Sequence, residues 1–335
     1  MSLYLVTGGC GFIGSHLVDA LLADGHEVRI IDNLSTGSRR NLPTGPAASR
    51  CELVVADITD QAAVERCFTG VDYCFHLAAV ASVQQSNEDW AGTHRANLTG
   101  SIHVFDAARA RQVPVVYASS AAVYGDNAAM PLKESARLRP LTAYGADKLG
   151  SELHARVASL VHAVPTTGLR FFNVYGPRQS SSSPYSGVIS IFASKLQRGE
   201  SLTIYGDGEQ VRDFIFVGDV VQYLLAAMRH TRGNPEAFNV CTGRSITINQ
   251  LARTMMSIAD QRVDIHYQPS RNGDIRVSVG SPEASERQLQ YRARTSLAAG
   301  LRELLQYEWA DRDEVPPMEQ ASRVVAERAL GAVPA

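Results

Sequence analysis

Residues 3–14 read LYLVTGGCGFIG and decide the fold of this chain of 335 residues. The first five residues form an apolar run of the kind found in a buried parallel strand. Glycines follow at positions 8, 11 and 14, and the segment 11–22 carries apolar residues at helical spacing. A strand, a glycine-rich turn and a helix in this order predict a nucleotide-binding α/β unit at the start of the chain.

The glycine-rich turn is suited to bind the phosphates of a dinucleotide. Backbone N–H groups at a helix N-terminus attract phosphate, and glycines allow close approach. The spacing of Gly8, Gly11 and Gly14 is Gly-x-x-Gly-x-x-Gly, which differs from the common Gly-x-Gly-x-x-Gly fingerprint. Asp32 ends the next apolar run, and a carboxylate there accepts ribose hydroxyls and repels a 2′-phosphate. We therefore predict NAD rather than NADP as the cofactor.

Short apolar runs alternate with helical segments further along the chain. This alternation predicts an α/β fold with a doubly wound parallel Rossmann sheet. The expected strands are residues 27–32, 53–56, 71–76, 113–118 and 167–172, and the expected helices are 61–68, 97–111 and 144–161. After residue 175 the composition changes, which predicts a smaller C-terminal α/β substrate-binding lobe. The expected units are an NAD-binding domain (1–175), a lobe interleaved with the last sheet strands (176–308) and a C-terminal tail (309–335).

Composition excludes several classes of protein. The net charge of −2 argues against a nucleic-acid partner or an anionic membrane surface. No signal peptide is recognisable, and no apolar run reaches the roughly 18 residues of a membrane helix. The five cysteines form no Cys-x-x-Cys pair, so neither a disulfide framework nor a metal site is predicted. We expect a cytoplasmic enzyme with reduced thiols.

Tyr144 and Lys148 form a Tyr-x-x-x-Lys pair within an expected helix. A phenol has a pKa near 10 and is a poor base at neutral pH. A lysine one turn away lies on the same helix face, where its charge stabilises the phenolate. Ser120, near the end of the preceding strand, can hydrogen-bond a substrate hydroxyl. The three residues predict a catalytic group that takes a proton from an alcohol during hydride transfer.

The chain resembles the extended short-chain dehydrogenases/reductases, and within them the UDP-hexose 4-epimerases. The similarity runs from Leu3 to about Tyr307. Besides the glycine turn and the Tyr144/Lys148 pair, the motifs that carry it are residues 32–37 (DNLSTG), Asp57-Ile58, residues 76–79 (HLAA), 119–125 (SSAAVYG), 171–178 (FFNVYGPR) and Arg212-Asp213.

The resemblance implies roles for individual residues. Asp57 and Ile58 would bracket adenine, and Ala78 and Ala79 would pass the pyrophosphate. Asn97 would support the edge of the site, with a helix N-cap as the alternative. The implied cofactor set is Gly8, Gly11, Phe12, Ile13, Gly14, Asp32, Asn33, Asp57, Ile58, Ala78, Ala79, Tyr144 and Lys148.

A UDP-sugar is the implied substrate. Arg212 and Arg271 would pair with its phosphates, a task suited to the guanidinium fork. Asn173 would bind the sugar diphosphate, and Asp274 would accept from the uridine ribose. The implied substrate-binding set is Ser120, Asn173, Val188, Tyr205, Arg212, Arg271, Asp274 and Ser278.

The resemblance also implies the reaction. Tyr144 removes the O4 proton, hydride passes from C4 to NAD, and after the 4-keto sugar turns over, hydride returns to its opposite face. Ser278 falls where the family places a gate beside C2, and its small side chain predicts that UDP-GlcNAc and UDP-GalNAc are accepted as well as UDP-glucose and UDP-galactose.

Other activities compete with 4-epimerisation as readings of these residues. A 4,6-dehydratase would carry an acid/base pair at Ala121 and Ala122, which argues against that reaction. A UDP-glucuronate decarboxylase or uronic-acid 4-epimerase is a second enzymatic reading. A non-enzymatic NAD-sensing regulator is a different class, but such a protein tends to lose the tyrosine or the lysine. The family commonly pairs two helices per subunit, which predicts a homodimer through 97–111 and 144–161.

Overall fold

The computed structural model describes residues 1–180, 187–231, 234–270 and 275–310, and a parallel β-sheet lies at its centre. Seven strands form this sheet in the order β11-β6-β5-β4-β1-β2-β3, and all neighbouring pairs are parallel. The predicted doubly wound fold is therefore confirmed, with strand ends shifted by one or two residues. The strands are β1 (Leu3–Thr7), β2 (Glu27–Asp32), β3 (Cys51–Val55), β4 (Tyr73–His76), β5 (Val115–Ser120), β6 (Thr166–Phe171) and β11 (Glu236–Val240).

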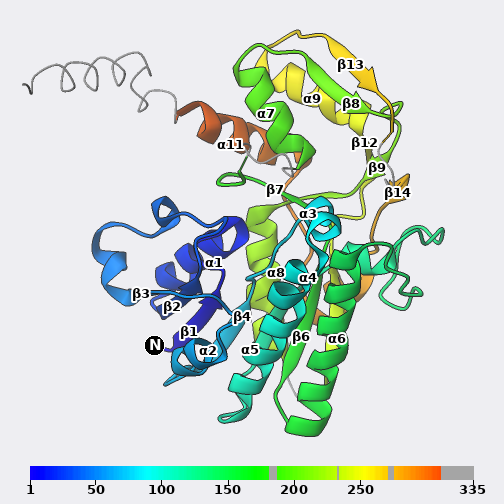
Figure 1. Ribbon diagram of the computed structural model, residues 1–335. Coiled ribbons are helices and arrows are strands. Elements are labelled where there is room, and N and C mark those ends of the chain that lie inside the picture. The colour runs from blue at the N-terminus through cyan, green and yellow to red at the C-terminus, as the bar shows by residue number, and fades with distance from the viewer. Residues whose placement is uncertain (181–186, 232–233, 271–274, 311–335) are drawn as a thin grey trace, which may run out of the picture.

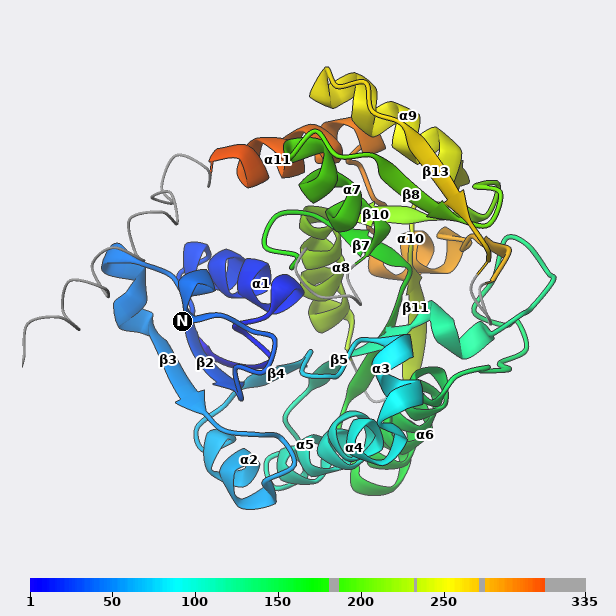
Figure 2. The same ribbon diagram turned by 45° about the horizontal axis from the view of Figure 1, so that its top comes forward.

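Helices cover both faces of this sheet, as Figures 1 and 2 show. One face carries α1 (Phe12–Ala23) and α8 (Val217–His230), and the other carries α2 (Gln61–Cys67), α5 (Gly100–Arg109) and α6 (Ala143–His162). Successive side chains of a strand point to opposite faces. Leu5 accordingly packs in the core on the α5 side, while Val6 packs in the core on the α1 side. Burial of both faces explains why the strand is an unbroken apolar run.

A smaller lobe lies at the top of Figure 1, beyond the sheet. Its core combines apolar residues of short strands with those of three helices, including Phe192, Leu251 and Leu304. The helices are α7 (Val188–Gln197), α9 (Ile248–Ala259) and α11 (Leu297–Ala310). Its short strands form three small sheets. Strand β7 (Asn173–Tyr175) pairs with β10 (Phe214–Phe216), and β8 (Leu202–Tyr205) pairs with β13 (Ile265–Gln268). Strand β9 (Val211–Arg212) lies between β12 (Ile246–Thr247) and β14 (Val277–Ser278) and pairs with both.

The chain crosses between the sheet and the lobe several times. After β6 it enters the lobe at β7, returns with α8 and β11, and enters the lobe again at β12. Helix α10 (Glu283–Leu289) then packs near α8 and β11 before α11 ends the described chain. No helix of these described segments combines the length and apolarity needed to cross a bilayer.

The helix predicted at 97–111 begins earlier than expected. Helix α4 (Trp90–His94) continues through a π-helical turn at Arg95–Thr99 into α5. Asp89 starts this path, because its side chain accepts a hydrogen bond from the N–H of Gly92. Asn97 lies within the π-helical turn, so the alternative reading of Asn97 as a helix N-cap is wrong.

Candidate functional site

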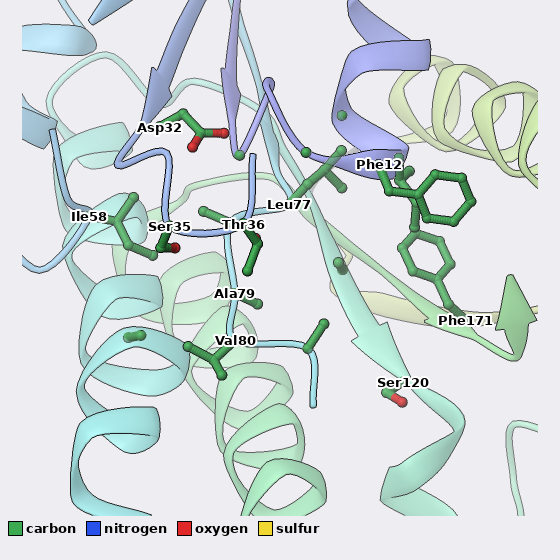
Figure 3. Close-up of a pocket in the computed structure, with 18 of the residues that line it drawn as sticks. Phe12, Asp32, Ser35, Thr36, Ile58, Leu77, Ala79, Val80, Ser120 and Phe171 are labelled. Carbon is green, nitrogen blue, oxygen red and sulfur yellow. The ribbon is translucent and has the colours of Figure 1, made fainter. Parts of the chain in front are cut away.

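A cavity of about 370 Å³ opens at the carboxyl ends of the central strands. Strand β2 lies on one side of β1 and β4 on the other, so the loops diverge here. Open α/β sheets bind ligands at such switch points. Figure 3 shows Asp32 and Ile58 on one side of the cavity, Phe12 and Phe171 on another, and Ser120 away from Asp32. Tyr144 and Lys148 of α6 also line it.

The space around the three glycines of the turn differs from one position to the next. A Cβ on Gly14 would lie 2.2 Å from the carbonyl oxygen of Gly8, and one on Gly8, where φ is +71°, would lie 2.8 Å from the nitrogen of Ala78. These two positions are filled by backbone. A Cβ on Gly11 would meet only the Gly8 oxygen, at 3.2 Å, and Gly11 lines the cavity as the N-cap of α1. Gly11 therefore leaves space for a phosphate beside the first N–H groups of α1.

Asp32 ends β2 as a buried carboxylate at the cavity wall. It accepts hydrogen bonds from the N–H groups of Cys10, at 2.9 Å, and Leu34, at 2.8 Å, which fix its direction. Each carboxylate oxygen keeps a further acceptor site, which suits ribose hydroxyls. Together with the open position at Gly11, this arrangement fits NAD.

Asn33 and Asp57 form the adjoining part of the wall. The Asn33 amide donates to the Asp57 carboxylate at 2.6 Å, and Thr59 donates to the other carboxylate oxygen through its N–H and its hydroxyl, both at 2.8 Å. Burial raises the pKa of Asp57, but these hydrogen bonds outweigh it and the net pKa is lowered. The loop after β3 is therefore held by an ionised carboxylate beside the cavity.

Tyr144 and Lys148 lie on the face of α6 that borders the cavity. The Lys148 Nζ atom donates to the carbonyl oxygen of Ala118 at 3.0 Å and lies 5.8 Å from the centre of the Tyr144 ring. Burial raises the pKa of Tyr144, and a hydrogen bond with Ser120 partly lowers it. Burial lowers the pKa of Lys148 to about 8. Phenolate formation at this position therefore depends on nearby positive charge.

The two adjacent serines both line the cavity, but their hydroxyl groups have different partners. The Ser120 hydroxyl oxygen accepts the N–H of Ala122 at 3.1 Å, which leaves its proton to donate toward Tyr144 or a ligand. Ser119 instead donates to Glu152 at 2.5 Å, and Glu152 forms an ion pair with the buried Arg170. Ser119 thus anchors strand β5 to a buried charge pair.

The wall after β4 is fixed by a chain of buried hydrogen bonds. The Thr7 hydroxyl oxygen accepts the N–H groups of Leu77 and Ala78 at 3.1 and 3.0 Å, and it contacts Nδ1 of His76 at 2.8 Å. Asn97 binds both the N–H and the carbonyl of Val80, at 2.8 and 3.1 Å. Residues 77–80 are therefore held from β1 and from the π-helical turn.

All predicted cofactor and catalytic residues line this one cavity. Most predicted substrate residues do not: Asn173, Val188, Tyr205, Arg212 and Ser278 lie on the small lobe, outside the cavity wall. Within that lobe, Ser278 pairs with Arg212 in the β14–β9 register. Arg271 and Asp274 lie outside the described residues.

The cavity also contains residues to which the sequence assigned no role. Ser35 and Thr36 belong to the 32–37 motif, and their position directly after β2 is a sequence signal for a place in the cavity wall. Phe171 ends β6 and Phe172 follows it, and both likewise belong to a motif named above, residues 171–178. Gln179 had no signal in the sequence, because its place depends on contacts within the lobe: it donates to Val174 and accepts from Ser190.

Comparison with known proteins agrees with this geometry. The profile of the family described as NAD dependent epimerase/dehydratase matches residues 4–241. A putative UDP-glucose 4-epimerase of Methanocaldococcus jannaschii is 36% identical over 81% of this chain and 87% of that protein. A UDP-glucose 4-epimerase of Mycolicibacterium smegmatis is 34% identical over 90% and 97%. UDP-glucuronic acid decarboxylase 1 of Arabidopsis thaliana is 31% identical over 89% and 67%.

Solved structures are similar over nearly the whole chain. A UDP-glucose 4-epimerase of Thermotoga maritima with UDP-glucose has a TM-score of 0.88 and 35% identity, covering 92% of this chain and 99% of that one. A UDP-N-acetylglucosamine 4-epimerase of Methanobrevibacter ruminantium has the same TM-score and coverage with 36% identity. A Thermus thermophilus UDP-glucose 4-epimerase in complex with NAD has a TM-score of 0.83 and 33% identity, covering 93% and 100%.

Proposed function

This chain belongs to the NAD-dependent epimerase/dehydratase family, and from this premise we propose that it is a UDP-hexose 4-epimerase. Its proposed substrates are UDP-GlcNAc and UDP-GalNAc, together with UDP-glucose and UDP-galactose. The observation that carries the proposal is the meeting of Ser120, Tyr144 and Lys148 in the same cavity as Asp32 and the glycine turn.

The catalytic residues have separate tasks in this proposal. NAD, held by the glycine turn and Asp32, supplies reversible hydride-acceptor chemistry when it is bound. Tyr144 holds and returns the proton of the sugar O4 hydroxyl. Ser120 donates a hydrogen bond toward the same oxygen, since its own oxygen already accepts the Ala122 N–H. Lys148, fixed by the Ala118 carbonyl, keeps positive charge near the phenol.

The residues after Ser120 favour epimerisation over 4,6-dehydration. Elimination of water across C5 and C6 requires a further acid and base near the sugar. The positions directly after Ser120 are Ala121 and Ala122, which open a short 3₁₀ helix (Ala121–Tyr124) and carry only methyl groups. Neither can transfer a proton, so oxidation at C4 would be followed by return of the hydride.

Ser278 supports acceptance of N-acetylated sugars. It is half-buried on β14, and Gly280, two residues later, packs against Phe172 of the cavity wall, where a Cβ would lie 2.7 Å from the ring. This contact joins the segment after Ser278 to a residue of the cavity wall, and in this proposal the sugar extends from the cavity toward Ser278. A serine there leaves more space than a tyrosine for a C2 substituent.

We expect Ser278→Tyr to lower kcat/KM for UDP-GlcNAc by about 10- to 200-fold, because the larger side chain competes with the N-acetyl group for space. The kcat/KM for UDP-glucose should change only a few-fold. Ser278→Ala is the matched control and should leave both values near those of the parent. Parallel initial-rate measurements on the two substrates check the result, and full N-acetylhexosamine turnover by Ser278→Tyr contradicts the gate assignment.

A uronic-acid reaction is the second candidate, because decarboxylases are 29–32% identical in sequence to this chain. The deciding experiment incubates purified protein with each UDP-sugar, without added NAD, and follows the anomeric protons by NMR. Formation of UDP-GalNAc from UDP-GlcNAc supports the proposal and also shows that the purified protein retains NAD. Conversion of UDP-glucose alone keeps 4-epimerisation and rejects the Ser278 argument. Release of CO₂ from UDP-glucuronate, with no hexose product in repeats with added NAD, rejects the proposal in favour of decarboxylation.

We further propose that the protein is a homodimer that pairs the exposed face of α6 with its copy. Leu153, Val157, Leu160 and Val161 are 58%, 47%, 60% and 68% exposed. They recur at helical spacing and form an apolar stripe on one side of this 20-residue helix. Burial of such a side chain contributes about 1.5–3 kcal/mol to association, and in a two-fold interface each side chain is buried once in each subunit.

Leu153→Glu is expected to convert the dimer to a monomer in sedimentation velocity, because each of the two subunits then places a charge in the apolar interface. Tyr307→Glu, an exposed site on α11, is the matched control and should stay dimeric. A parent protein that sediments as a monomer at micromolar concentration contradicts the dimer. Unchanged dimer mass for Leu153→Glu contradicts this interface.

A further inference from the structure

Asp147 is a buried acid that the proposed reaction does not use. It directly precedes Lys148 on α6, and its side chain is only 5% exposed. Its Oδ1 atom lies 2.8 Å from Nδ1 of His94, while its Oδ2 atom is buried without a hydrogen-bond partner among the described residues. A buried carboxylate oxygen that lacks a partner is costly, about 1–3 kcal/mol or more. A purely structural link between α4 and α6 would not need a charged group.

His94 orients this carboxylate from the protein surface. It is the last residue of α4, which packs against α6, and its side chain is 47% exposed. His94 and Asp147 are separated in sequence by α5 and β5, and this contact joins them. With Nδ1 facing Asp147, the imidazole donates to the carboxylate and holds it toward the interior.

The other charged groups around Lys148 do not replace Asp147. His76 on β4 is buried. Its burial, as the larger cause, and the Lys148 charge, as the smaller one, lower the pKa of His76 to about 3. The imidazole is therefore neutral at physiological pH. Glu152, one turn further along α6, is engaged by Arg170 of β6 in a buried ion pair whose charges cancel. Tyr144 is a neutral phenol until it loses its proton. Asp147 is the charged group that opposes the effect of burial on Lys148.

We propose that Asp147, oriented by His94, is a positioning residue that keeps Lys148 in its ammonium form beside Tyr144. The inference deepens the proposed function and rests on it for its catalytic meaning. Burial favours the neutral amine, and a neutral Lys148 does not stabilise the Tyr144 phenolate. The nearby carboxylate raises the pKa of Lys148 in opposition to burial, and the two effects together leave that pKa at about 8. Loss of the Asp147 charge therefore moves deprotonation of Lys148 to lower pH.

The sequence offers a direct readout, because its only lysines are Lys133, Lys148 and Lys195. Protein labelled with ¹³C-lysine gives one set of side-chain Cε signals for each, and Lys148→Arg assigns the signal that belongs to Lys148. Its titration midpoint is measured by NMR on the whole protein without any sugar. The result is independent of turnover, so a failure of the epimerase proposal and a failure of this inference are separable.

Asp147→Asn keeps the size of the side chain and removes its charge. We expect the Lys148 midpoint to fall by about 1 pH unit or more, and the alkaline limb of the kcat/KM profile to move with it. His94→Leu should shift the midpoint in the same direction by less, and His94→Gln, which keeps an N–H donor, should restore it. Asp264→Asn removes an exposed charge on the small lobe and should leave the midpoint unchanged.

A purely structural role predicts a different pattern. In that case Asp147→Asn lowers the melting temperature but leaves the Lys148 midpoint where it was, and this outcome overturns the inference. A midpoint that shifts equally in Asp264→Asn overturns it as well, because the effect would then be one of net charge. If Asp147→Asn does not fold, the His94→Leu and His94→Gln pair decides the question with the same readout.

Discussion

Tyr144→Phe is expected to lower kcat for UDP-hexose epimerisation by about 10²- to 10⁴-fold, which is the contribution of a positioned proton-transfer group. Phenylalanine keeps the ring on α6 beside Lys148 and removes only the hydroxyl that hydrogen-bonds Ser120. The remaining residues of the cavity stay in place, so NAD should be retained. Initial rates by NMR measure kcat, and nucleotide released on denaturation measures the NAD content.

Tyr73→Phe is the matched control for this change, since it removes a phenol hydroxyl on β4 at a position that does not line the cavity. It should retain the parent rate. Unchanged turnover by Tyr144→Phe would show that another group carries the proton and would remove the central residue of the proposed mechanism. Loss of NAD from Tyr144→Phe would instead mean that the change had disturbed the cofactor site.

The second large effect is expected at the glycine turn, where Gly14→Ala and Gly11→Ala should fail in different ways. The new Cβ at Gly14 would stand 2.2 Å from the Gly8 oxygen and 2.9 Å from the Gly9 Cα atom. Backbone cannot rotate away as a flexible side chain can, so the turn and α1 must separate. We expect a loss of about 1–3 kcal/mol in the free energy of unfolding together with loss of bound NAD.

Gly11→Ala tests the cofactor without the same damage to packing. Its Cβ would be 3.2 Å from the Gly8 oxygen and would otherwise enter the cavity. The melting temperature should stay close to that of the parent, while the NAD content after purification should fall. Thermal denaturation and nucleotide analysis of both variants separate the two effects. Full NAD content in Gly11→Ala would contradict the placement of a phosphate at this glycine.

Local spacing was sufficient to predict that the proposed cofactor residues gather at one edge of the sheet. A glycine turn between an apolar strand and a helix has few conformations, and a carboxylate at the end of the next parallel strand must point to the same sheet edge. Tyr144 and Lys148 needed only the helical repeat to share a face. All of these residues line one cavity in the structure. The predicted substrate residues are not brought together by local spacing, because most of them lie in a lobe that the chain enters more than once.

The sequence by itself determined the sheet, the glycine turn, Asp32 and the Tyr144/Lys148 face, since each depends on residues that are neighbours along one strand or helix. Only the tertiary structure decided that the Ser119 hydroxyl binds Glu152 while the Ser120 hydroxyl does not, and that His94 meets Asp147. These contacts join residues separated by whole helices and crossovers. Their geometry is fixed by how the elements pack, and packing depends on the complete core rather than on any local repeat.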